Sequence, residues 1–352
     1  LVPNMWRDPW FWREETLAAR LVTTALSPLG MLYHAIGKAR MHRIKPEPLG
    51  TCAIICIGNA SLGGVGKTPF AIALYRMLTD RLGNDDAIGF LTRGYGGSLA
   101  GPVRVDPKTH TAEMVGDEAL LLARHGPVWL ARDRKAGADF AATHGARCLL
   151  CDDGYQNPRL PKDLSILLVP VPIPARAQIF PAGPLREPVA DAAARADAVV
   201  FVTQDGTDEF PKTGTEPLIR ILTDRRLSGR AWLSPTEAWM GAGQAGPVLA
   251  FCGIGNPDRF RQTLHAAGAA IADFIAFPDH YPYNDDDIRA LRRAAKRQGA
   301  RLITTEKDHV RLPSAFAADV DTLPVSMTIL CDGLIDRCLA VLPQNAHRPV
   351  SS

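Results

Sequence analysis

The stretch CIGNASLGGVGKTPF, from Cys56 to Phe70, decides the fold of this chain. An apolar run leads into a glycine-rich loop, which leads into helix-forming residues. The glycines let successive backbone N–H groups surround a phosphate, the lysine can neutralise its oxygens, and the threonine can hold Mg²⁺. The stretch therefore predicts a nucleotide-phosphate loop, with a catalytic role for its lysine. The predicted loop residues are Ser61, Leu62, Gly63, Gly64, Val65, Gly66, Lys67 and Thr68.

The sequence around this loop alternates short apolar runs with helical segments. Such alternation is typical of an α/β fold, here a P-loop NTPase-like three-layer core with a mostly parallel sheet. At 352 residues the chain is long enough for a second, smaller α/β lobe. We expect a P-loop kinase domain at 46–211, an interlobe connection at 212–239, the smaller lobe at 240–331 and a C-terminal tail at 332–352.

Composition and cysteine usage exclude several classes of protein. Hydrophobic residues make up 46% of the chain and charged residues 22%, with a formal net charge of +3, so the sequence is neither disordered nor a nucleic-acid binder. The seven cysteines lie in apolar runs, which predicts reduced thiols packed in the core. Cys148 and Cys151 form a C-x-x-C, but strand alternation points them to opposite faces of a sheet.

A second motif, CLLCDDGYQ, places Asp152 and Asp153 at the end of an apolar strand. Carboxylates in this position hold the metal in P-loop proteins. Taken alone, two acids after a strand also fit a solvated turn. Together with the upstream loop they predict a Mg²⁺ site formed by Thr68, Asp152 and Asp153, and hence a nucleoside triphosphate as ligand.

The N-terminal segment 5–45 has the pattern of a helix at a membrane surface. Tryptophans precede an apolar stretch, and Lys38, Arg40, Arg43 and Lys45 follow it. Charges and Pro28 within the stretch argue against a spanning helix, whereas interfacial aromatics and a basic flank suit an anionic leaflet. We expect a peripheral, amphipathic membrane-associating helix. A helix packed on the protein's own core has the same periodicity and stays open as an alternative.

Eight motifs occur together and in order: GNASLGGVGKTP, LTRGYGG, VGDEALLLA, DDGYQN, FPAGPLREP, FCGIGNPDRF, FPDHYPY and TTEKDHVRL. In this order and spacing the chain resembles the tetraacyldisaccharide 4'-kinases of lipid A biosynthesis, in which the position of Ser61 is commonly Thr or Ser. The resemblance implies transfer of the ATP γ-phosphoryl group, with Mg²⁺, to the 4'-hydroxyl of an acylated disaccharide 1-phosphate lipid. It also implies a peripheral location at the cytoplasmic face of the bacterial inner membrane.

The resemblance further implies a catalytic pair. Asp117, in VGDEALLLA, matches the catalytic aspartate of the family, and His280, in FPDH, matches the histidine that pairs with it. A carboxylate that accepts the proton of a sugar hydroxyl is what phosphoryl transfer to an alcohol needs. Without the resemblance, a helix N-cap and a surface loop are the simpler interpretations. Asp279 is expected to support the histidine, and Glu118 to lie near the metal or phosphate.

Arginines are expected at the phosphates because guanidinium groups match phosphoryl oxygens. The candidates are Arg93, Arg132, Arg134 and Arg186, joined by Tyr95 for the nucleotide or sugar and Gln156 for the metal site. Lys307, in TTEKD, is expected either to face the nucleotide or to bridge the lobes. The chain has Tyr155 and Asn157 where many relatives have Phe and His. Two other functions stay open: a P-loop GTPase or assembly ATPase, and a nucleotide-dependent membrane-binding module.

Overall fold

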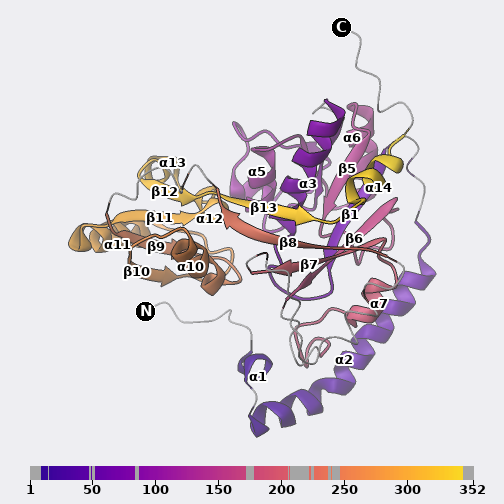
Figure 1. Ribbon diagram of the computed structural model, residues 1–352, viewed down its shortest axis with the longest axis horizontal. Helices are drawn as coiled ribbons and strands as arrows, with labels where there is room; N and C mark the ends of the chain where they lie inside the picture. Colours follow the sequence, from indigo (N-terminus) through magenta and orange to yellow (C-terminus); the bar gives the residue numbers. More distant parts are fainter. Residues whose placement is uncertain are drawn as a thin grey trace.

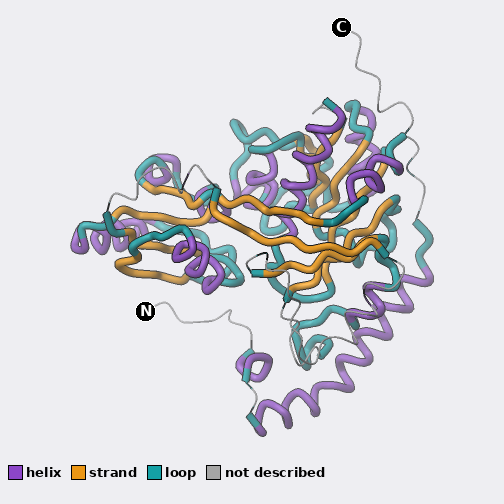
Figure 2. The backbone as a smooth tube through the Cα atoms, in the orientation of Figure 1, coloured by secondary structure: helices purple, strands orange, loops and turns teal. Residues whose placement is uncertain are grey.

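Two β-sheets lie side by side in the computed structural model, as Figure 1 shows. The larger one carries the phosphate loop, and the smaller one lies beyond the ends of two long strands of the larger sheet. Figure 2 shows helices on both faces of the larger sheet, as a three-layer α/β fold requires. The structure describes residues 9–14, 16–46, 49, 52–83, 87–171, 178–204, 206, 222, 226–236, 239 and 246–343.

Within the described residues, the larger sheet has nine strands. In spatial order they are β13 (Val325–Leu330), β8 (Leu227–Pro235), β7 (Ala198–Thr203), β6 (Leu164–Pro170), β1 (Ala53–Asn59), β5 (Cys148–Asp152), β2 (Ile88–Thr92), β4 (Val128–Leu130) and β3 (Val103–Arg104). The strands from β8 to β4 run parallel, and only β13 and β3 run antiparallel to their neighbours. Every residue of β1 is buried, because helices cover both faces of a parallel sheet. The predicted α/β fold is confirmed.

Alternate residues of β1 pack into apolar clusters on opposite faces of the larger sheet. Ile55 and Ile57 pack with α3 (Lys67–Leu82), α5 (Asp117–Ala123) and α14 (Leu334–Ala340). Ile54 faces the opposite side, toward α6 (Arg134–Thr143). Next to it, Cys56 packs toward α7 (Val189–Ala193). The same alternation separates Cys148 from Cys151, as predicted. A short α4 (Ala112–Val115) precedes α5.

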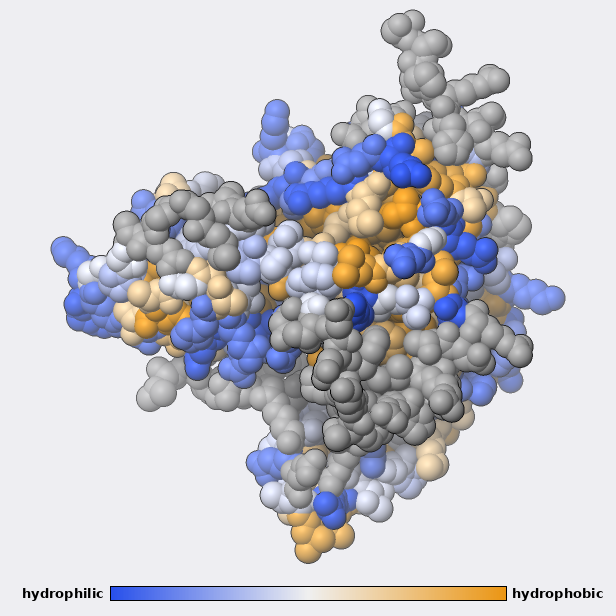
Figure 3. Space-filling view, in the orientation of Figure 1, coloured by the Kyte–Doolittle hydropathy of each residue, from blue (hydrophilic) through white to orange (hydrophobic). Residues whose placement is uncertain are grey.

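The N-terminal helices α1 (Trp10–Arg13) and α2 (Leu17–Arg43) lie outside these layers, and α2 runs along α7 (Figure 1). The small residues Ala19, Thr23 and Gly30 face the protein. The large apolar residues face outward, and Figure 3 shows a hydrophobic tip where α2 begins. They are Leu17, Leu21, Leu29, Met31, Leu32, Tyr33 and Ile36. This distribution opposes a helix that buries its leucines in the protein's own core.

The described contacts of α2 with the rest of the protein include polar ones and one between aromatic rings, in which the ring centres of Tyr33 and Phe180 lie 5.8 Å apart. Ser27 Oγ donates to Gln178 Oε1 at 3.0 Å, and Asp191 lies 3.0 Å from His34 Nε2 and 3.3 Å from Lys38 Nζ. From α1, Trp12 Nε1 donates to the Pro181 carbonyl at 3.1 Å. The first of the three predicted interfacial tryptophans, Trp6, lies outside the described residues. In the part of the chain that the structure describes, no helix is both long and apolar enough to cross a bilayer.

The smaller sheet has four parallel strands. They are β10 (Ile271–Ala276), β9 (Val248–Cys252), β11 (Arg301–Thr305) and β12 (Val320–Leu323). Its helices are α10 (Pro257–Ala266), α11 (Asp285–Gln298), α12 (Glu306–His309) and α13 (Ser314–Ala317). Residues of α11 and α10 contribute to two separate apolar clusters, which use alternate residues of β9.

The lobe boundaries differ from those expected from the sequence. Much of 212–239 lies outside the described residues, but β8 within it is a strand of the larger sheet rather than a connection. Residues 325–331 were expected in the smaller lobe, yet β13 pairs with β8. Within the expected tail, α14 packs on the core under α3. Strand partners are set by contacts distant in sequence, which a local apolar pattern does not specify.

Candidate active site

The phosphate loop follows β1 and ends at the first turn of α3. Gly66 caps this helix with φ 97°, and Gly63 has φ 107°, conformations that glycine adopts without strain. The backbone N–H of Leu62 donates to the Pro184 carbonyl at 2.6 Å, so this end of the predicted loop is anchored to the protein. Lys67 Nζ donates to Asn59 Oδ1 at 3.1 Å, an interaction that no sequence motif indicated.

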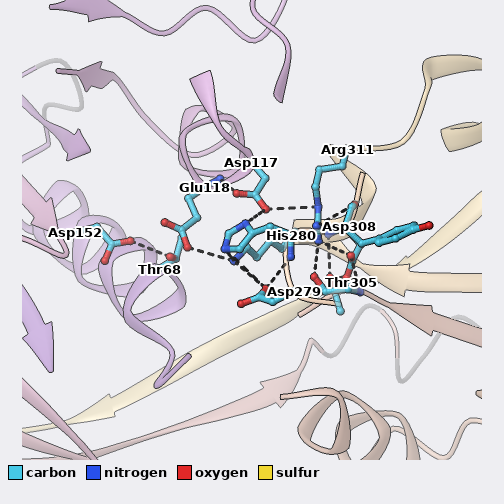
Figure 4. Close-up of polar contacts among 12 residues, drawn as sticks. Thr68, Asp117, Glu118, Asp152, Asp279, His280, Thr305, Asp308 and Arg311 are labelled. Carbon is cyan, nitrogen blue, oxygen red and sulfur yellow. Dashed lines mark hydrogen bonds and ion pairs between the residues drawn. The ribbon is translucent and has the colours of Figure 1, made fainter. Parts of the chain in front are cut away.

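The predicted metal ligands meet at the ends of β5 and α3. Thr68 Oγ1 donates to Asp152 Oδ2 at 2.9 Å, as Figure 4 shows. Burial raises the pKa of Asp152 to about 7, and the nearby Glu118 carboxylate adds to the effect. Asp152 Oδ1 is buried and has no hydrogen-bond partner among the described residues. A buried, unpaired carboxylate oxygen beside a threonine hydroxyl fits a hard cation.

The second aspartate is held differently. Asp153 Oδ1 lies 3.4 Å from Lys67 Nζ and 3.3 Å from Arg186 Nη1. Burial would raise its pKa, but these two cations outweigh burial and lower the pKa of Asp153. Its φ of 58° is left-handed, a conformation that costs energy for a non-glycine residue and is common at functional sites. No three His, Cys, Asp or Glu side chains in the described ranges converge as a metal cage, so Mg²⁺ would also need nucleotide oxygens.

A second cluster joins the two lobes. His280 Nδ1 lies 2.9 Å from Asp117 Oδ2, although the residues are 163 positions apart. Asp117 is the first residue of α5, where its Oδ1 accepts the Glu118 backbone N–H at 2.8 Å. His280 follows β10 in the smaller lobe and has φ 55°. Figure 4 shows its ring between Asp117 and Asp279. The structure thus brings together the pair that the resemblance implied.

Lys307 occupies the other side of the histidine ring. Its Nζ lies 3.3 Å from His280 Nε2 and 3.3 Å from Glu118 Oε1, so it bridges the lobes. An ammonium group can only donate, so Nε2 accepts and Nδ1 carries the proton that His280 donates to Asp117. Burial would raise the pKa of Asp117, but the His280 hydrogen bond and the Lys307 charge outweigh it and lower that pKa.

Behind this pair lies a buried set of hydrogen bonds centred on Asp308, which we call the Asp308 hub. The sequence analysis missed it. Asp308 is fully buried and accepts from the Gly253 N–H at 2.8 Å, the Tyr283 hydroxyl at 2.8 Å and Thr305 Oγ1 at 2.6 Å. Arg311 also donates to Asp308, and its Nε lies 3.5 Å from Asp117 Oδ2 (Figure 4). The hub therefore connects the core of the smaller lobe to the predicted base. Its only sequence signal was the motif TTEKDHVRL, which gave Arg311 no role.

The remaining predicted residues are dispersed. Arg93 is exposed at the end of β2, and Arg132 Nη2 donates to the Ser98 carbonyl at 3.1 Å. Arg134 is buried and donates to the Asp153 carbonyl at 2.7 Å, so it holds the backbone of the predicted metal ligand Asp153. The ring of Tyr95, 65% exposed, lies 5.3 Å from the His280 ring. Only Tyr95 of these extends the Asp117 and His280 cluster.

Arg186 links the predicted metal site to a groove. Its Nη1 lies 3.5 Å from Gln156 Oε1, while Gln156 Nε2 donates to the Asn59 carbonyl at 2.8 Å. Both side chains line a cavity of about 510 Å³ between α2 and the α7 region. We call this cavity the cationic groove, and the cationic side chains in its lining are Lys38, Arg40, Arg186 and Arg195. Tyr155 lies in the core, and its hydroxyl donates to the Ala192 carbonyl at 2.7 Å.

Comparisons with known proteins show the family of this chain. The family model described as Tetraacyldisaccharide-1-P 4'-kinase matches residues 22–341. Two proteins named Tetraacyldisaccharide 4'-kinase, from Methylobacterium nodulans and Rhodospirillum centenum, are 46% and 43% identical to this chain. The first alignment covers 91% of both chains, and the second covers 96% of both. The "apo" form of LpxK from Aquifex aeolicus in complex with ATP has a TM-score of 0.69 and 25% identity, over 92% of this chain and all of that one. The chain therefore belongs to the tetraacyldisaccharide-1-P 4'-kinase family.

Proposed function

We propose that this protein transfers the γ-phosphoryl group of ATP to the 4'-hydroxyl of tetraacyldisaccharide 1-phosphate. Family membership and the likeness to an ATP complex support the nucleotide and the acceptor. The observation that carries the mechanism is the 2.9 Å contact between His280 Nδ1 and Asp117 Oδ2, made where the smaller lobe meets the phosphate loop. A GTPase or assembly ATPase does not need a base shared between lobes.

In the proposed reaction, the 4'-oxygen bonds to the γ-phosphorus while the bond to the β–γ bridging oxygen breaks and ADP leaves. Asp117 accepts the hydroxyl proton, and His280 orients the carboxylate through its Nδ1–H. Lys67 and the loop N–H groups bind the phosphate oxygens. Thr68, Asp152 and Asp153 would hold Mg²⁺, which neutralises developing charge on the phosphates when bound.

The acceptor is proposed to approach through the cationic groove. Arg186 lies at the metal-site end of this groove, and Lys38 and Arg40 line its α2 wall. Cations in that position suit the phosphate of the acceptor. The outward leucines of α2 would rest on the lipid surface, so the acyl chains need not leave the bilayer. The corresponding location is peripheral, at the cytoplasmic face of the bacterial inner membrane.

The test is transfer of labelled γ-phosphate from ATP to tetraacyldisaccharide 1-phosphate in mixed micelles. The wild-type chain is compared with Asp117→Ala, and ATP binding is measured for both. Mg²⁺-dependent bis-phosphorylated product from wild type alone would support the reaction and the base. ATP binding without product in wild type would contradict the acceptor assignment. Vesicle binding that depends on ATP, and that Asp117→Ala leaves intact, would then favour a nucleotide-dependent membrane-binding module.

A further inference from the structure

The loop that precedes α10 lies directly against the phosphate loop. A Cβ placed on Gly255 would lie 3.8 Å from the Gly64 backbone nitrogen. A Cβ placed on Gly66 would lie 3.8 Å from Nη1 of Arg259, the third residue of α10. The smaller lobe thus presents one guanidinium group at the end of the loop where α3 begins. None of the roles described above uses Arg259.

The charge environment of Arg259 is unusual for a partly buried arginine. Among the described residues, no carboxylate pairs with its guanidinium group, and burial alone lowers the pKa of Arg259. Arg311, by contrast, is paired with Asp308 and Asp117. Gly66 also begins a helix of 16 residues, whose N-terminus carries positive partial charge. The guanidinium group of Arg259 and the N-terminus of α3 are both positive and repel each other. A bound anion between them would remove that repulsion.

We propose that Arg259 binds the polyphosphate chain of the nucleotide seated on the phosphate loop. This inference rests on the proposed function, because the anion is the ATP that the kinase uses. The guanidinium fork contacts phosphate oxygens with two donors and stays protonated at working pH. Lys67 holds the phosphates from the larger lobe and Arg259 from the smaller one. Charge that spreads over the phosphate oxygens during transfer is then met by cations of both lobes.

Arg261 provides a matched control on the same helix. It lies two residues further along α10, and its guanidinium carbon is 4.3 Å from the centre of the Phe274 ring. That contact keeps Arg261 within the smaller lobe. Replacement of Arg261 removes the same charge from the same helix without removing the group beside Gly66. Comparison of the Arg259 and Arg261 variants therefore distinguishes loss of a local phosphate contact from a general change in the charge of the smaller lobe.

The experiment measures Kd for ATP, ADP and AMP by calorimetry with the full chain in the presence of Mg²⁺. The proteins compared are wild type, Arg259→Met, Arg259→Lys and Arg261→Met. We expect Arg259→Met to weaken ATP binding by about 10- to 100-fold, the effect of losing charge-assisted hydrogen bonds. AMP binding should change by less than about threefold, because AMP lacks the β- and γ-phosphates. Arg259→Lys should recover part of the loss, and Arg261→Met should bind as wild type.

Two results would overturn the inference. One is ATP binding by Arg259→Met that equals wild type. The other is an equal loss for ATP and AMP, which would place the contact on the nucleoside or the α-phosphate that both ligands share, rather than on the β- and γ-phosphates. Thermal unfolding is measured for each variant, and if Arg259→Met does not fold, Arg259→Lys and Arg259→Gln decide by the same comparison. Failure of the wild-type chain to bind any ATP is a different result, since it would contradict the proposed function itself.

Discussion

The imidazole of His280 donates from Nδ1 to Asp117 Oδ2 over 2.9 Å, and this one hydrogen bond joins a loop of the smaller lobe to the first residue of α5. The carboxylate at its other end also accepts the Glu118 N–H and lies near Arg311. Such a carboxylate is fixed in direction and ionised. This hydrogen bond underlies the expected behaviour of turnover and its pH dependence, whereas stability, metal use and membrane binding depend on other residues.

Replacement of Asp117 by Asn should separate turnover from nucleotide binding. The amide keeps the shape of the side chain but cannot accept the hydroxyl proton, so we expect kcat to fall by about 10²- to 10⁴-fold. The phosphate loop is untouched, so Kd for ATP should stay within about twofold of wild type. Single-turnover kinetics and calorimetry measure the two quantities. An unchanged kcat would show that Asp117 is not the general base.

Lys307→Met should move the acidic limb of the kcat/KM profile to higher pH. The Lys307 ammonium group helps to lower the pKa of Asp117, so its removal raises that pKa. Asp117 then becomes protonated, and inactive as a base, at a higher pH than in wild type. Profiles from about pH 3 to 8 measure the limb, because the pKa of Asp117 in wild type is lowered below its ordinary value of 3.8, and Lys307→Arg is expected to restore it. Lys296→Met, an exposed position on α11, is the control. Identical limbs for Lys307→Met and wild type would contradict the prediction.

Asp308→Ala should destabilise the protein more than any exposed carboxylate replacement. The substitution leaves several buried donors and the Arg311 charge without their partner, at a cost of about 3–5 kcal/mol in the free energy of unfolding. Asp319→Ala breaks an exposed ion pair with Arg292 and should cost less than about 1 kcal/mol. Urea denaturation compares the two variants. Equal losses would show that the Asp308 hub contributes little.

Chelation of Mg²⁺ should abolish phosphoryl transfer, and Asp152→Asn should weaken the metal site specifically. The substitution removes a buried anionic ligand, so the Mg²⁺ concentration for half-maximal rate should rise by about 10- to 100-fold. Asp139→Asn, on the exposed face of α6, removes the same charge outside the site and serves as the control. A Mg²⁺ dependence equal to that of wild type in Asp152→Asn would place the metal elsewhere.

Outward leucines of α2 should carry membrane binding. Leu21 and Leu32 are 64% and 58% exposed, and burial of each in lipid contributes up to about 1.5–3 kcal/mol. We expect the double variant Leu21→Gln, Leu32→Gln to bind anionic vesicles at least about 100-fold more weakly, with ATP binding unchanged. Thr24→Gln, exposed on the same helix, should bind like wild type. Cosedimentation of all three with vesicles is the measurement, and equal binding would exclude α2 as the anchor.

Local patterns predicted the larger lobe well because its chemistry is local in sequence. The apolar run before the glycines forms β1, and the loop runs directly into α3, as expected from the period of the apolar residues and the phosphate motif. Asp152 and Thr68 lie 84 positions apart but meet because parallel strands end at one edge of the sheet. Strand-end reasoning was sufficient for this pair.

Contacts between the lobes could not be predicted from local sequence patterns. Only resemblance to a family connected Asp117 with His280, since nothing in either motif specifies the other. Arg311 and Arg259 were overlooked because a single arginine in a sequence is usually a solvated or structural cation. What distinguishes these two is what faces them across the lobe boundary. The strand β13 was misplaced for the same reason, because its partner β8 is about ninety residues earlier.

The return of the chain to the larger sheet also sets an order for synthesis. Met327 and Ile329 of β13, with Leu334 and Cys338 of α14, belong to the apolar cluster under the phosphate loop. A ribosome makes these residues after the whole smaller lobe, so a nascent chain that already carries the nucleotide loop still lacks one wall of its core. The nucleotide-binding lobe can therefore be completed only after β13 and α14 have been synthesised, and messages truncated before β13 would yield an exposed apolar surface in place of a kinase.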